Sequence, residues 1–65
     1  MDNQIYLDVE AVIGNGTYSD TASYEVVKLM MKANVVTIRN VSVEVKEIEV
    51  TNDGVVRFHG NRREM

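Results

Sequence analysis

The chain has 65 residues, contains no cysteine, proline or tryptophan, and carries 10 acidic residues against 7 basic ones, a formal net charge of −3. The absence of cysteine excludes a disulfide framework and a thiolate metal site, and the length leaves no room for a cofactor domain beside a substrate domain. The negative charge argues against binding nucleic acid by bulk attraction. We expect a single domain over residues 1–65, ordered from about residue 4 to residue 59, with a frayed tail at 60–65.

The composition favours a sheet and an association with a second chain. There are 12 Val and 4 Ile against 2 Leu, and β-branched side chains suit a pleated sheet. A domain of this size buries only about 60% of its unfolded surface, and small cores without disulfides often depend on oligomerisation. No apolar run approaches the roughly 20 residues that span a bilayer, and the start at Met1–Gln4 is polar and acidic, unlike a secretory signal. We therefore expect a cytoplasmic homodimer with no membrane partner.

Hydrophobic alternation identifies the first element. Apolar and polar residues alternate from Gln4 to Ile13, which predicts a strand. The segment from Gly14 to Asp20 is rich in glycine and cap-forming residues and predicts a loop. Residues 21–33 predict a helix that begins at Asp20 or Thr21 and stops at Asn34. A strand through the same valine-containing segment is the alternative.

The second half of the chain predicts strands again. We expect a short strand at 35–39, a longer bent strand at 41–51 and a return strand at 55–59, because the apolar positions keep period two within each segment. The apolar residues change between even-numbered and odd-numbered positions at Arg39–Asn40 and again at Lys46–Glu47. Each change would move them to the other face of the strand, which predicts a turn at the first place and a bulge at the second. The dipeptide Asp53–Gly54 predicts a tight hairpin turn. The predicted fold is therefore α+β, in the order β-α-β-β(-β), with one helix packed on a mainly antiparallel sheet.

The predicted helix carries more apolar surface than one sheet can cover. One apolar stripe contains Val26 and Leu29, and a second stripe flanks it, whereas a helix on its own sheet needs an apolar stripe about 100° wide. The excess predicts a homodimer interface, formed by Tyr24, Val27, Met30 and Met31.

Acidic residues dominate the polar face of the predicted sheet. Asp8 and Glu10 alternate with the apolar residues of the first strand, and Glu44 and Glu49 do the same on the long strand. If these strands are near one another, the four carboxylates form an acidic face that suits a basic partner surface. A charged face that serves only solubility is the alternative. Tyr18, in the predicted loop, is the best candidate for an exposed aromatic anchor.

The sequence offers little for catalysis. The segment Gly14-x-Gly16 lies between a strand and a helix but lacks the third glycine of a dinucleotide fingerprint and the lysine of a phosphate loop. His59 is the single histidine, and it has no nucleophile, orienting partner or set of metal ligands beside it. We therefore expect no enzymatic activity, cofactor, metal or small-molecule substrate.

Two kinds of binding function follow from these residues. The first is a non-enzymatic homodimer that binds another protein as an inhibitor or adaptor, a type of small acidic chain often encoded by phages and mobile elements against host enzymes or defence systems. The second is a small dimeric nucleic-acid-binding regulator. It would use the basic residues near the carboxyl end, namely Arg57, His59, Arg62 and Arg63.

Overall fold

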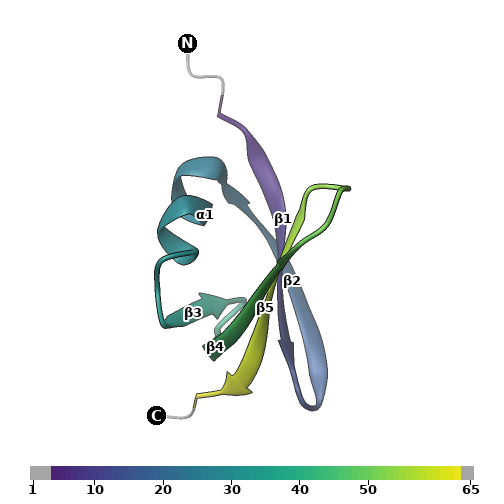
Figure 1. Cartoon of the computed structure of the whole chain (residues 1–65), viewed down its shortest axis with the longest axis vertical. Coiled ribbons are helices and arrows are strands. Elements are labelled where there is room, and N and C mark those ends of the chain that lie inside the picture. Colours follow the sequence, from purple (N-terminus) through teal and green to yellow (C-terminus); the bar gives the residue numbers. More distant parts are fainter. Residues whose placement is uncertain (1–3, 64–65) are drawn as a thin grey trace.

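The computed structural model describes residues 4–63 as five strands and one short helix. Strands hold 63% of these described residues and the helix 12%. In chain order the elements are β1 (Tyr6–Ile13), β2 (Gly16–Ser23), α1 (Tyr24–Met30), β3 (Val35–Ile38), β4 (Val41–Val50) and β5 (Val55–Arg62) (Figure 1). Within the described residues, no helix has the length and apolar character needed to cross a membrane.

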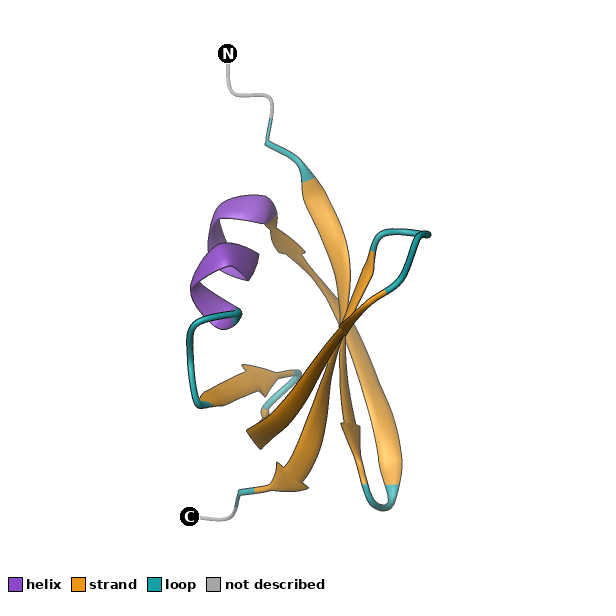
Figure 2. Ribbon diagram, in the orientation of Figure 1, coloured by secondary structure: helices purple, strands orange, loops and turns teal. Residues whose placement is uncertain are grey.

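The strands form one sheet in the order β2-β1-β5-β4-β3. β1 and β5 run parallel beside each other, and every other neighbouring pair is antiparallel. The sheet twists so strongly that its two edge strands, β2 and β3, come into contact. Figure 2 shows α1 beside the curved sheet, between the end of β2 and the start of β3. The result is a nearly closed, barrel-like sheet.

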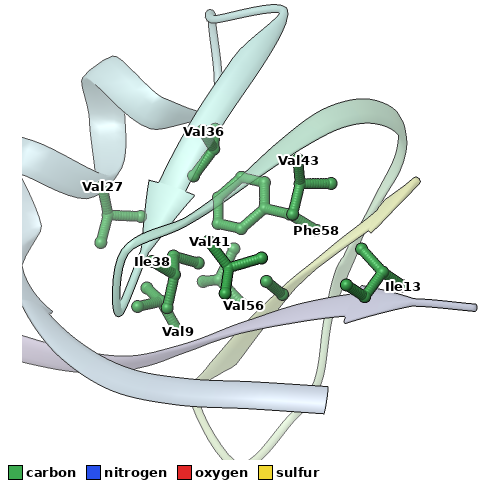
Figure 3. Packing of buried hydrophobic residues seen from close by; sticks show 10 residues of the cluster. Val9, Ile13, Val27, Val36, Ile38, Val41, Val43, Val56 and Phe58 are labelled. Carbon is green, nitrogen blue, oxygen red and sulfur yellow. The ribbon is translucent and has the colours of Figure 1, made fainter. Parts of the chain in front are cut away.

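The core lies inside this curved sheet and consists of ten buried apolar residues. Phe58 of β5 is its largest side chain and is completely buried, in one cluster with Val9 of β1 and Val43 of β4 (Figure 3). α1 adds one buried side chain, Val27. Because side chains alternate along a strand, each strand has an inner face toward this core and an outer face on the opposite side.

The predicted α+β fold, with a helix packed on a sheet, is wrong because residues 16–23 form a strand. The chain turns at Gly14–Asn15, and β2 then pairs with the whole of β1. β2 is an edge strand with mostly exposed polar side chains, so it lacks the apolar alternation that identifies a strand. The helix consequently begins only at Tyr24, where the Ser23 hydroxyl accepts a hydrogen bond from the Val26 N–H at 3.3 Å.

The other predicted elements are close to the observed ones. β1, β3 and β4 occupy the predicted segments, and the predicted turn at Arg39–Asn40 has positive φ values of 51° and 66°. The register of β4 against β5 shifts between Val45 and Glu47, which confirms the predicted bulge. The last hairpin differs in detail, since Gly54 alone has a positive φ there and the Thr51 N–H donates to the Val55 carbonyl.

β5 is longer than predicted, and Gly60 is the reason that it fits. Residues 60–62 belong to the predicted frayed tail but pair with residues 43–45 of β4; residues 64–65 lie outside the described part. At the bulge the two backbones come so close that a Cβ on Gly60 would collide with the Glu44 carbonyl group and lie 3.2 Å from the Lys46 amide nitrogen. Backbone atoms cannot swing aside as a side chain can, so this position requires glycine.

We expect Gly60→Ala to lower the free energy of unfolding by about 3 kcal/mol, because β4 and β5 must separate to admit the methyl group. Gly14→Ala is the matched control, since a Cβ there meets no atom within 4 Å. Urea unfolding of both variants measures the difference. Equal stability of the two would contradict the close approach at the bulge.

Candidate functional site

The outer face of the sheet gathers five carboxylates from two strands. Asp8 and Glu10 alternate with the buried residues of β1, and β4 adds Glu44 before the bulge and Glu47 and Glu49 after it. β5 lies between these two strands. Its outward-facing residues therefore fall between the two sets of carboxylates.

Arg57 and His59 occupy these positions on β5. The register places Arg57 directly between Glu10 of β1 and Glu49 of β4, and His59 opposite Glu47. The Arg57 Nε donates a hydrogen bond to Glu10 Oε1 at 2.8 Å, and Arg57 Nη1 lies 3.5 Å from Glu49 Oε2. His59 Nε2 lies 2.9 Å from Glu49 Oε1. We call these four residues, Glu10, Arg57, Glu49 and His59, the outer-face network.

The network fixes the protonation of two of its members. The hydrogen bond from His59 lowers the pKa of Glu49, and Arg57 adds to this effect, against a smaller opposing contribution from burial. The hydrogen bond to Glu10 raises the pKa of Arg57. Glu49 is therefore held as a carboxylate and Arg57 as a cation. Glu49 is exposed and Arg57 is half-buried at the surface, so water screens both charges and the network matters more for the arrangement of charge on the face than for stability.

The remaining carboxylates of this face are not neutralised in the same way. Within residues 4–63, Asp8, Glu44 and Glu47 make no ion pair, and all three are exposed. They surround the network, which leaves the face acidic overall. The structure thus brings Asp8, Glu10, Glu44 and Glu49 onto one face of the sheet, and it adds Glu47, which has the same outward direction after the bulge.

Tyr18 is not at the tip of a loop. It belongs to β2, pairs with Ala11 of β1, and is half-buried against the core cluster. Its position gives no support to a role as an exposed anchor.

The predicted dimer residues divide between the core and the surface. Val27 is 1% exposed and belongs to the core of the single chain, and Met30 packs against that core. Tyr24 and Met31 are exposed, and the Lys28 ammonium lies 5.1 Å from the centre of the Tyr24 ring. The helix therefore presents a different side to solvent than its apolar periodicity indicates.

Sequence reasoning missed the exposed apolar surface that α1 does present. Leu29 is 69% exposed and Val26 is 46% exposed, although their stripe is the one expected to face the sheet. Together with Met30, Ala33 and β3 they line a shallow groove of about 240 Å³. The feature that explains this exposed surface is the shortness of the helix. A helix of two turns that buries only Val27 in the core leaves its other apolar residues at the surface.

The basic residues near the carboxyl end do not form one cluster. Arg57 and His59 face carboxylates within the outer-face network. Arg62 is at the end of β5 opposite Val43, and the Arg63 N–H donates to the Ser42 carbonyl at 2.7 Å. In the part of the chain from residue 4 to residue 63, no three His, Asp or Glu side chains are arranged to hold a metal ion.

Comparison with known protein families, with characterised proteins and with solved structures finds no similar protein. The function is therefore inferred from the surfaces of this chain alone.

We expect Glu49→Gln to change the acid sensitivity of the protein. A carboxylate whose pKa is lower in the folded state adds stability above its unfolded pKa, near 4.5, and this contribution is lost as the pH falls through the folded value. The wild type should therefore be more stable than Glu49→Gln at pH 7, and the difference should shrink on acidification below about 4.5. Urea unfolding across this pH range tests it, with Glu47→Gln as the control outside the network. A difference that stays constant with pH would show that Glu49 is not held by this network.

Proposed function

We propose that this protein is a non-enzymatic, cytoplasmic binding protein, a homodimer that docks onto a basic surface of another protein through the outer face of its sheet. The observation that carries this proposal is the gathering of five carboxylates on one face, with one arginine and one histidine between them. Complementary charge across an interface speeds encounter and excludes wrongly charged partners.

The arrangement of the face supports docking better than a role in solubility alone. Its central charges are ordered by contacts between three neighbouring strands, so the face is held in place before a partner arrives. Asp8, Glu44 and Glu47, which pair with no basic residue between positions 4 and 63, lie around that ordered centre and can meet a partner's lysine or arginine side chains. A face built for solubility has no need of an ordered centre.

An inhibitor and an adaptor both use such a surface, and a phage or another mobile element is the kind of source that encodes small acidic chains of this type. In an inhibitor, the acidic face would cover a basic groove of a host enzyme or defence protein. In an adaptor, the same face would hold one partner while another surface holds a second.

The alternative, nucleic-acid binding through the carboxyl-terminal basic residues, has less support. Phosphate binding needs positive charge that is free to face the backbone, whereas Arg57 and His59 already contact carboxylates. Only Arg62 and Arg63 of the proposed basic residues could then contact phosphate, and they lie at one end of a sheet whose outer face is acidic.

We expect the double variant Asp8→Lys, Glu44→Lys to fold normally and to lose its protein partner. Both residues are exposed and lie outside the network, so the fold should survive while the charge of the face reverses around its centre. Pull-down of the tagged full chain from a lysate of its source organism, read by mass spectrometry, should recover roughly tenfold less partner than the wild type.

The control for this experiment is Asp20→Lys, Asp53→Lys, which changes the net charge equally at exposed positions away from the outer face. It should retain the partner. Equal recovery by both double variants would rule out the outer face as the docking surface. Loss of all captured material after nuclease treatment would instead support the nucleic-acid alternative.

A further inference from the structure

The groove between α1 and β3 gathers apolar side chains that the fold leaves uncovered. On the helix side it is lined by Val26, Leu29 and Met30, and on the strand side by Val35 and Val36. Figure 1 shows the two elements on the same side of the molecule. Val26 and Leu29 are exposed. Exposed apolar residues that are gathered in one hollow, and not scattered singly, mark a site of interaction.

The size of the groove limits what can occupy it. Its volume is about 240 Å³, which is below the roughly 300–1,000 Å³ of pockets that enclose a small-molecule ligand. The groove is also shallow, so a small ligand would leave much of its surface in water. A large apolar side chain of another protein suits it better, because the residues around such an anchor cover the rim and exclude water.

The charges beside the groove lie on the helix. A second hollow adjoins it, shares Val26 and Leu29 with it, and is lined further by Glu25, Lys28 and Lys32. The Lys28 Nζ lies 3.4 Å from Glu25 Oε1, and both side chains of this pair are exposed. Lys32 pairs with no acidic residue among residues 4–63. Two lysines against one glutamate give this side of the groove an excess of positive charge, in a chain whose net charge is −3.

The strand side of the groove has the opposite preference. β3 consists of valine, threonine and isoleucine and carries no charge itself. The register places Glu44 of β4 opposite Val35, so an acidic group above β3 is repelled, whereas one above the end of α1 is attracted by Lys32. A partner that fits both sides has its acidic side chains over the helix and uncharged ones over the strand.

We propose that this groove docks a second protein partner, through a segment that combines large apolar side chains with acidic ones. An apolar side chain of the segment enters the groove against Leu29 and Val35, and an acidic side chain beside it pairs with Lys32. The outer face repels the same segment, so the two surfaces select partners of opposite charge. The inference goes beyond the proposed function, because it requires neither a partner on the outer face nor a second copy of the chain.

The test uses the full chain as bait for a displayed library of short random-sequence peptides. Peptides that the wild type retains and Leu29→Gln loses are those that use the groove, and we expect them to combine large apolar residues with Asp or Glu. Glutamine removes the apolar surface but keeps a high helix propensity. Val50→Gln, at another exposed apolar position, is the matched control and should retain the same peptides.

One of the retained peptides is then titrated against charge variants. Lys32→Glu should weaken its binding roughly tenfold, because an attracting charge on the rim becomes a repelling one. Lys46→Glu makes the same change at an exposed residue of β4 and should leave the affinity unchanged. Lys32 is exposed and follows the end of α1, so this variant decides the question if Leu29→Gln fails to fold by circular dichroism.

Three results overturn the proposal: no peptide that depends on Leu29 or Lys32, a groove-dependent set that is basic or uncharged, or binding that Lys32→Glu leaves unchanged. A two-chain mass in sedimentation that falls to the single-chain 7.3 kDa with Leu29→Gln also overturns it, because a second copy would then occupy the groove. Peptides on the outer face are recognised separately, by their loss with Asp8→Lys, Glu44→Lys. Failure at the groove therefore leaves the proposed function of the outer face standing.

Discussion

The parallel pairing of β1 with β5 is the constraint on which the rest of the structure depends. It joins the first and last strands of the described chain and places them in the interior of the sheet order, with a hairpin on either side. On the inner face it sets Val9 beside Val56 and Ala11 beside Phe58, which are four of the ten core residues. On the outer face the same register sets Glu10 beside Arg57 and thereby orders the charged surface. One pairing thus determines both the packing of the core and the charge pattern of the face behind it.

The outer face and the groove beside α1 are physically distinct surfaces. The outer face presents charge held at fixed positions by the strand register, and such a surface selects partners by complementarity. The groove lies between α1 and β3 and is lined mainly by apolar side chains.

Local patterns were sufficient for some elements and insufficient for others. The alternation through Leu7, Val9 and Ala11 and the valines of β4 identify strands because those strands have one buried and one wet face. β2 was missed because it is an exposed edge strand without apolar alternation, and its Ser and Asp residues are typical of loops. Its pairing with β1 makes it a strand. The predicted helix was too long for a related reason. Residues 21–23 belong to β2 because they pair with β1, and those partner residues are too distant in the sequence for a local pattern to reveal them.

The candidate site shows the same division. The outward direction of Asp8, Glu10, Glu44 and Glu49 follows from alternation alone, so their common face was predictable. The position of Arg57 and His59 between these carboxylates was not predictable, because it depends on β5 lying between β1 and β4 in the sheet. The apolar groove between α1 and β3 was not predictable either, because it requires knowing how the helix lies beside that strand.

The position of β5 also has a consequence for how the protein is made. The hydrophobic centre cannot assemble until Val56 and Phe58 are available, and both lie late in the chain, whereas their partner strand β1 is synthesised first. A nascent chain that stops short of residue 55 therefore holds β1 and β4 with no strand to join them, and its apolar faces remain open. Contacts so distant in sequence slow folding and delay it until synthesis of this region is complete. A truncation that removes β5 would therefore leave the β1–β2 and β3–β4 hairpins without the strand that pairs with both, instead of a smaller version of the same sheet.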